Sequence, residues 1–368
     1  MKTELHRLKV RSLAVRAVAA PMKRPLATST GAVTVAPLLL LDLRTSAGIT
    51  GRSYLFGIGR QTLAPLARLV AAMGEMLQGD ALAPFEIERK LRARHTLLGV
   101  HNIVLFAISG IDMAAWDALG QALGQPLVRL LGGAPRPVRA YNSKGLGIMP
   151  PKALAKEAEE LVAEGFEAVK LRLGRSRAED DLVALRATRK AIGPKVTLMV
   201  DFNQALSVTE AIRRGRMIDA EGGVLWIEEP VRADDLAGCA RVAREVATPI
   251  QIGENFMGPE QMAQALAAQA CDYVMPDAQR IGGVTGWMRA AALAQGAGLE
   301  MSSHLFPEAS CQLLAVTPTC HWLEYVDWAE PVLEAPVVLQ KGRVLCPARP
   351  GLGMKWDERA VRRYALDA

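Results

Sequence analysis

Three acidic residues recur along the second half of the chain at a nearly constant interval. Asp201, Glu228 and Glu254 are 27 and 26 residues apart, and each comes at or just after the end of a short, strand-like apolar run. Carboxylate oxygens are the ligands that a hard divalent cation such as Mg2+ prefers, whereas no Cys or His joins the set at zinc-ligand spacing. Any one acid could instead pair with a nearby arginine, but three in register predict a Mg2+ site.

A histidine between two further carboxylates continues the series. Asp277, His304 and Glu324 follow at steps of 23, 27 and 20 residues. A carboxylate can fix the tautomer of an imidazole and raise its basicity, so that it accepts or returns a proton near neutral pH. We therefore predict that Asp277 and His304 form an acid–base pair, although a histidine taken alone is more often structural. A protonated Glu324 could donate a hydrogen bond to a substrate carboxylate that is becoming an enolate.

The elements that carry these residues are short β-rich runs alternating with longer helical stretches. Eight candidate strands follow residue 137, at 138–143, 168–173, 196–201, 224–228, 249–253, 273–276, 299–303 and 322–325. The first two add Ser143, Lys170 and Arg172 to the series. In a barrel of alternating strands and helices, the carboxyl ends of all strands meet on one catalytic face. A doubly wound open sheet fits the periodicity as well, but it would not predict this ring of reactive residues.

The first third of the chain has a different pattern. Residues 4–19 and 35–43 alternate as strands, and the segment 21–31 between them, which contains Pro, Gly, Ser and Thr, predicts a mobile loop. Helical spacing then extends from residue 63 to about 123. Gly132, Gly133 and two prolines follow, so we expect a domain boundary there.

Composition excludes several classes of partner. The 368 residues are 50% apolar, and the net charge of +6 is scattered without long runs of one sign, so nucleic acid is not an expected partner. The longest apolar run, 33–41, is too short for a bilayer, and the amino terminus lacks a continuous apolar signal region, so no membrane contact is expected. Five scattered cysteines predict reduced thiols and a cytoplasmic location.

The runs around these residues resemble the mandelate racemase subgroup of the enolase superfamily over almost the whole chain. They are 46–48, 53–56, 110–120, 200–204, 226–230, 253–255, 275–286 and 302–306. The resemblance implies an α/β fold: a modified TIM-type (β/α)7β barrel at 133–354 under an α+β capping domain at 1–132. Loops at about 21–31 and 51–60 would cover the active site. The last segment, 355–368, would return to the capping domain.

The same resemblance implies a role for each site residue. Mg2+ would be bound by Asp201, Glu228 and Glu254. The substrate carboxylate would be held by Ser143 and Lys170, and Asn203 would also bind the substrate. Proton transfer would use the dyad Asp277 and His304, with Glu324 as the electrophilic acid. The substituent pocket would be lined by Leu26, Thr30, Val33, Phe56, Ile58, Leu305 and Val326.

Arg172 is the one departure from the subgroup's catalytic set, because a second lysine, the base on the opposite face, is usual there. A lysine of pKa about 10.4 costs roughly 5 kcal/mol to deprotonate at pH 7, and an arginine above about 12.5 costs roughly 7 to 9. Arg172 is therefore either an impaired base or a cation that grips the substrate.

Three functions follow from these alternatives. The first is a racemase or epimerase that abstracts the α-proton of a 2-hydroxy carboxylate through a metal-stabilised enediolate. The second is an acid-sugar dehydratase with His304 as the main base, and the third, ranked last, is a non-catalytic binding protein. In each case we expect a small carboxylate ligand and, as is common in the family, a homo-oligomer.

Overall fold

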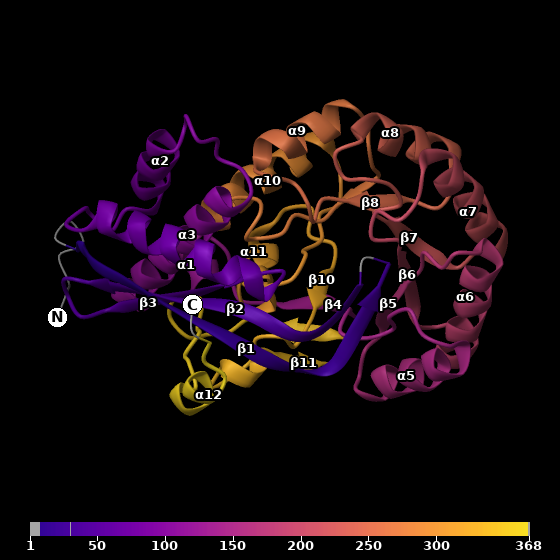
Figure 1. The fold of residues 1–368 in the computed structure, drawn as a ribbon, viewed down its shortest axis with the longest axis horizontal. Coiled ribbons are helices and arrows are strands. Elements are labelled where there is room, and N and C mark those ends of the chain that lie inside the picture. The colour runs from indigo at the N-terminus through magenta and orange to yellow at the C-terminus, as the bar shows by residue number, and fades with distance from the viewer. Residues whose placement is uncertain (1–7, 30, 367–368) are drawn as a thin grey trace.

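The structure is a computed structural model that describes residues 8–29 and 31–366. Its amino-terminal domain is a three-stranded antiparallel sheet with three helices (Figure 1). The strands, in spatial order, are β1 (Val10–Thr28), β2 (Gly31–Thr45) and β3 (Thr50–Phe56). The helices are α1 (Arg60–Leu77), α2 (Pro84–Arg94) and α3 (Ile103–Leu123). Four consecutive leucines of β2, Leu38 to Leu41, are all buried, so both faces of the sheet are covered.

The segment predicted as a loop at 21–31 is mostly strand, which corrects that expectation. β1 continues to Thr28 and pairs with β2, with a register irregularity between Pro21 and Leu26. The prolines that suggested a loop lie in β1, an edge strand of the sheet, where a missing N–H group is tolerated. The predicted loop at 51–60 is likewise β3 up to Phe56, followed by a short turn into α1. Thr30 lies outside the described residues.

The second domain is a closed barrel surrounded by helices (Figure 1). Its parallel strands are β4 (Pro137–Asn142), β5 (Ala168–Arg172), β6 (Thr197–Asp201), β7 (Val224–Glu228), β8 (Ile250–Ile252), β9 (Tyr273–Val274) and β10 (Leu323–Tyr325). They pair in chain order from β4 to β9, and β10 pairs with β4. The covering helices are α5 (Pro151–Ala163), α6 (Ala178–Ile192), α7 (Val208–Glu221), α8 (Leu236–Glu245), α9 (Pro259–Ala267), α10 (Gly283–Ala297) and α11 (Pro307–Val316). The predicted fold class, an α/β barrel with an α+β cap, is confirmed.

The strand predicted at 299–303 is reduced to isolated bridges, which is the second correction. Met301 forms single parallel bridges to Val274 on one side and to Cys320 on the other. Backbone hydrogen bonds from Ser302 to Val274 and from Ser303 to Trp322 still connect the segment to both neighbours. The segment therefore closes the barrel between β9 and β10 without forming a continuous ladder.

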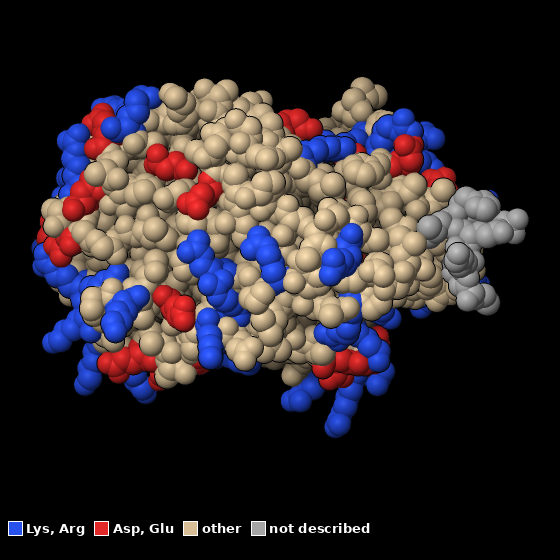
Figure 2. Space-filling view, turned by 180° about the vertical axis from the view of Figure 1, so that it is seen from behind, with Lys and Arg blue, Asp and Glu red and all other residues tan. Residues whose placement is uncertain are grey.

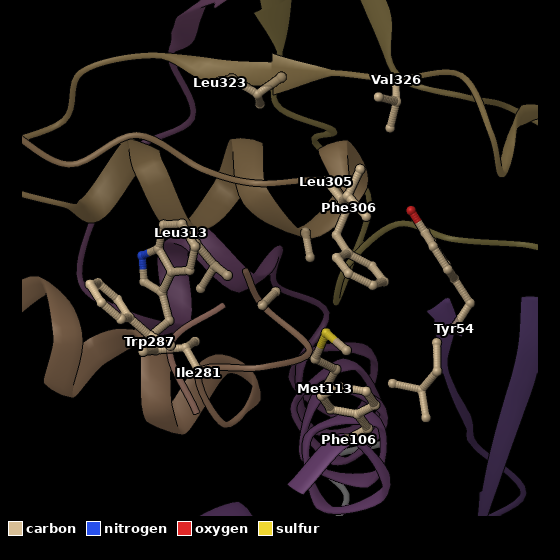
Figure 3. Packing of buried hydrophobic residues seen from close by; sticks show 14 of the residues in the cluster. Tyr54, Phe106, Met113, Ile281, Trp287, Leu305, Phe306, Leu313, Leu323 and Val326 are labelled. Atoms are coloured by element: carbon tan, nitrogen blue, oxygen red, sulfur yellow. The ribbon is translucent and has the colours of Figure 1, made fainter. Parts of the chain in front are cut away.

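An apolar interface joins the two domains. Phe106 and Met113 of α3 and Tyr54 of β3 face Leu305 and Phe306 of the barrel (Figure 3), and the rings of Tyr54 and Phe306 are 5.0 Å apart. α3 is long and apolar enough to cross a membrane, but 89% of its most apolar window is buried inside the protein. It is therefore the core helix of this interface, which holds the capping domain against the barrel.

The remaining elements pack around the base of the barrel and the capping sheet. They are α4 (Leu127–Leu130), the 3-10 helix η2 (Glu330–Val332), β11 (Val338–Gln340), β12 (Arg343–Leu345) and α12 (Glu358–Arg363). The carboxyl-terminal segment lies along β1, where Leu366 donates to the carbonyl of Ala17 and Ala19 donates to that of Tyr364. Figure 2 shows a face on which acidic and basic side chains are interspersed.

Candidate active site

Three carboxylates from successive strands converge at the mouth of the barrel. Asp201 ends β6, Glu228 ends β7, and Glu254 follows β8 by two residues. One oxygen from each lies within 4.8 Å of the others. Burial raises the pKa of Glu228 to about 8; Lys170 opposes this shift, and the neighbouring carboxylates add to it. The negative charges of the three carboxylates repel one another, and a bound Mg2+ would relieve this repulsion. Because their oxygens are hard donors, the three residues fit a Mg2+ ion.

Lys170 lies at the centre of the acidic cluster. Its Nζ is 3.3 Å from Asp201 Oδ2 and 2.8 Å from Glu324 Oε1, and it also contacts Glu228. Burial alone would lower the pKa of this ammonium group, but the three carboxylates outweigh burial and raise the pKa above its ordinary value. Lys170 is therefore a fixed cation, suited to binding an anionic group and unsuited to acting as a base.

His304 and Asp277 form the predicted pair. His304 Nδ1 is 2.6 Å from Asp277 Oδ2, and the other oxygen of Asp277 accepts a hydrogen bond from the Gln279 N–H. His304 Nε2 lies 3.4 Å from Glu254 and 3.7 Å from Glu324. Burial would lower the pKa of the imidazole, but the charges of Glu254, Glu324 and Asp277 raise it to about 9. Asp277 thus fixes the ring with Nε2 directed toward the acidic cluster.

Glu324 accepts hydrogen bonds at both of its oxygens and lies beside cations that disfavour the protonated acid expected from the sequence. Oε1 accepts a 2.6 Å hydrogen bond from Ser143 Oγ, and Oε2 accepts one of 2.9 Å from the Leu305 N–H. Burial would raise the pKa of Glu324, but Lys170 and His304 are close enough to lower it well below its usual range. The spacing of residues along the chain could not show that these cations meet at one carboxylate.

Arg172 is fixed by neighbours on three sides. Nη1 donates to the Gly145 carbonyl at 3.1 Å, Nη2 donates to Ser143 Oγ at 2.6 Å, and Nε is 4.0 Å from Asp201 Oδ2. The side chain is 6% exposed. These contacts orient a guanidinium cation at the wall of the site.

Glu324 lies between Arg172 and His304, the two candidates for proton transfer. Its Oε1 is on the side of Ser143, which Arg172 contacts, whereas its Oε2 is on the side of His304. A substrate bound against Glu324 would therefore have Arg172 and His304 on different sides.

A cavity of about 360 Å3 opens over these groups. The polar residues that line it include Ser143, Lys170, Arg172, Asp201, Asn203, Glu229, Glu254, Asn255, Arg280, His304 and Glu324. The apolar residues that line it are Leu26, Val33, Phe56, Ile58, Leu305, Val326 and Trp328. Of the predicted site residues, Glu228 lies behind Lys170 and Asp277 lies behind His304. Thr28 lines the cavity near the tip of the β1–β2 hairpin.

Sequence reasoning missed a polar group beside the metal-ligand cluster. Arg280 Nη1 donates to the Glu254 carbonyl at 2.9 Å and to Asn255 Oδ1 at 2.6 Å. Asn255 Nδ2 in turn donates to both oxygens of the buried Glu229, at 2.8 and 2.9 Å. Glu229 and Asn255 each directly follow a predicted metal ligand, which was the one available signal. Gln204 and Trp328 are further cavity residues that were missed.

We expect the substitution Arg280→Met to weaken Mg2+ binding about 10- to 100-fold, the usual effect of losing a group that orients a metal ligand. Arg280 holds the backbone of Glu254 and lies 3.6 Å from its carboxylate. Isothermal titration of Mg2+ into the purified protein would measure the change. Arg213→Met is the matched control, because the Arg213 side chain is 51% exposed, pairs with Glu210 in α7 and does not line the catalytic cavity. A Kd for Mg2+ within twofold of wild type in the Arg280 variant would contradict this role.

The site as a whole defines a class of enzyme. Three carboxylates suited to Mg2+, a buried lysine and a histidine–aspartate pair surround one cavity at the carboxyl ends of barrel strands. A Mg2+ bound there supplies positive charge that stabilises the negative charge developing on a substrate carboxylate. The arrangement is that of a magnesium-dependent enzyme that abstracts a proton next to a carboxylate.

Comparison with known families agrees with this class. Residues 10–132 match the family model "Mandelate racemase / muconate lactonizing enzyme, N-terminal domain", and residues 153–360 match "Enolase C-terminal domain-like". The chain therefore belongs to the enolase superfamily, within its mandelate racemase and muconate lactonizing enzyme group.

Three relatives show how close the similarity is. An enolase from Bradyrhizobium, crystallised with magnesium and mandelic acid, is 41% identical over the full length of both chains, with a TM-score of 0.95. An enolase from the alphaproteobacterium BAL199 with bound Mg is 44% identical over 98% of this chain and 100% of that one, also with a TM-score of 0.95. The L-talarate/galactarate dehydratase of Salmonella typhimurium is 32% identical over 90% of this chain and 83% of its own length. Mg2+ is the cofactor of this family.

Proposed function

We propose that this enzyme is a racemase or epimerase of 2-hydroxy carboxylates that carry an apolar substituent. The observation that carries the proposal is the composition of the cavity lining. Seven of its residues, among them Leu26, Phe56 and Val326, are apolar, and the described residues of the capping domain contribute no charged group to it. A sugar acid would place several hydroxyl groups against these apolar residues and leave them without partners, which is costly. The mandelic acid bound to the Bradyrhizobium relative supports the same type of ligand.

The proposed reaction assigns a task to each group. Asp201, Glu228 and Glu254 hold Mg2+, and Lys170 and Ser143 bind the substrate carboxylate. A Mg2+ bound at Glu254 would offset part of the negative charge that raises the pKa of His304, so that the neutral imidazole can remove the α-proton on one face. The guanidinium group of Arg172 donates a proton to the opposite face to give the other enantiomer, and the reverse reaction uses the same two groups in exchanged roles. The cation of Lys170 is already in place for the negative charge that develops, so little reorganisation is needed.

A dehydratase is the second candidate, and the position of Arg172 favours it. The hydrogen bonds to Gly145 and Ser143 orient Arg172 as a cation, and a cation cannot accept a proton. His304 would then be the main base: it removes the α-proton, and the β-hydroxyl group leaves as water. The 32% identity to L-talarate/galactarate dehydratase supports this alternative.

Proton NMR in deuterated water distinguishes the two candidates. The enzyme with Mg2+ is incubated separately with each enantiomer of mandelate, and the α-proton signal is followed. A racemase exchanges the α-proton of both enantiomers and interconverts them. A protein that binds mandelate but exchanges neither enantiomer would contradict the racemase proposal. Loss of water from an acid sugar such as galactarate, detected in the same assay, would establish the dehydratase.

A further inference from the structure

A second cavity of about 300 Å3 adjoins the catalytic cavity. The two share four lining residues, which are Phe56, Ile58, Asn255 and Arg280. The second cavity lies between the turn that joins β3 to α1, the start of α3, and the barrel loops that carry Asn255 and Arg280. It therefore lies next to the catalytic cavity, at the interface between the capping domain and the barrel.

Ile58 forms part of the partition between the two cavities and has an unusual conformation. Its φ is +61°, a left-handed value that is an outlier for a β-branched residue. The surrounding turn maintains this conformation through hydrogen bonds from Gly57 to the Pro37 carbonyl and from Thr62 Oγ1 to the Gly59 carbonyl. Ile58 is nevertheless 53% exposed. A strained turn thus presents an apolar side chain to open space where the cavities meet, as at sites shaped for a ligand.

The second cavity is mainly apolar. Leu66, Ile103, Phe106 and Met257 contribute most of its apolar lining, and Ile103 is 37% exposed. At the shared boundary lies the guanidinium group of Arg280, which can stack on the face of an aromatic ring. An aromatic group that extends from the catalytic cavity would therefore contact Arg280 and then enter an apolar space.

We propose that this second cavity, which we call the side cavity, binds the distal aryl group of the substrate. The substrate class is then a 2-hydroxy carboxylate whose aromatic substituent is longer than a single phenyl ring. The inference rests on the proposed function for the position of the carboxylate, and it adds the side cavity as a specificity subsite. Ile103 is the subsite residue best suited to a test, because it is 37% exposed at the first turn of α3 and is not among the residues that line the catalytic cavity.

The test compares mandelate with 4-phenylmandelate, in wild type and in the variant Ile103→Trp, whose larger side chain fills the side cavity. Isothermal titration with Mg2+ present gives Kd for each compound. We expect wild type to bind 4-phenylmandelate at least tenfold more tightly than mandelate. Ile103→Trp should raise the Kd for 4-phenylmandelate at least tenfold and leave the Kd for mandelate within twofold of wild type. The matched control is Leu97→Trp, the same change at a fully exposed apolar residue outside both cavities. Thermal melting shows whether each variant is folded.

The outcomes separate the subsite from the reaction. The subsite proposal would be overturned if wild type bound the two compounds with equal affinity. It would also be overturned if the folded Ile103 variant lost affinity for both compounds to the same extent. If that variant fails to fold, the wild-type preference decides alone. Exchange of the α-proton, measured on the same samples, tests the reaction independently. A preference for 4-phenylmandelate without exchange of either compound would support the subsite and reject the racemase.

Discussion

Replacing His304 by asparagine is expected to lower the rate of α-proton exchange by about 10²- to 10⁴-fold, the usual contribution of a general base. Asparagine retains a polar group beside Asp277 but has no basic nitrogen in the position of Nε2. Exchange would be measured by NMR for each enantiomer of mandelate, with Mg2+ at saturation. His101→Asn is the matched control, because His101 is exposed and lines neither the catalytic cavity nor the acidic cluster.

The pattern of loss in the His304 variant also reports on Arg172. If a second base works on the opposite face, one enantiomer loses exchange and the other retains it. If wild type exchanges one enantiomer alone and the variant exchanges neither, His304 is the sole base, and the dehydratase becomes the better proposal. Wild-type exchange of both enantiomers in His304→Asn would contradict the assignment of His304 as a base.

The barrel and the converging residues could be predicted because both depend on a short repeat. From Asp201 to Glu324 the successive site residues are 20 to 27 residues apart, and the barrel converts that spacing into proximity at one face. Asp201, Glu228 and Glu254 therefore lie together in the structure, as do Asp277 and His304. These predictions needed no knowledge of how individual side chains pack.

The predictions that failed depended on long-range contacts. Prolines 21 and 25 suggested a loop, because the sequence does not show that β1 is an edge strand. The strand expected at 299–303 pairs through single bridges at Met301, since its neighbours β9 and β10 are themselves only two and three residues long. Strand length in a closed barrel is set by these neighbours and not by local propensity.

The charge states within the site could not be predicted for a similar reason. The pKa of Glu324 depends on Lys170 and His304, which lie 154 and 20 residues away along the chain. Arg280 was overlooked because it orients Glu254 through a backbone carbonyl, a contact that leaves no pattern in the sequence. The chemistry that each residue can perform could be predicted from the sequence. The electrostatic interactions between these residues could not, because they depend on distances that only the folded structure shows.

The substitution Arg172→Lys is expected to increase exchange on the face opposite His304 by about 10²- to 10³-fold. The ordinary pKa of lysine is two to three units below that of arginine, so a correspondingly larger fraction is neutral and basic at pH 7. The shorter side chain also loses the two hydrogen bonds to Gly145 and Ser143 that orient the guanidinium group. The experiment is enantiomer-resolved exchange of mandelate by NMR, in which only the enantiomer whose α-proton faces position 172 should accelerate.

Arg172→Met is the control that separates basicity from charge, because it removes both. If Arg172 is an impaired base, exchange on its face rises in the lysine variant and falls in the methionine variant. If Arg172 acts only as a cation that grips the substrate, the lysine variant gives no gain, and the affinity for substrate falls in both variants, more in methionine. No gain in the lysine variant would contradict a racemase with two bases. It would favour a reaction in which His304 is the only base. Under the proposed function, the identity of the side chain at the end of β5 would decide between inversion and elimination on an otherwise shared set of groups.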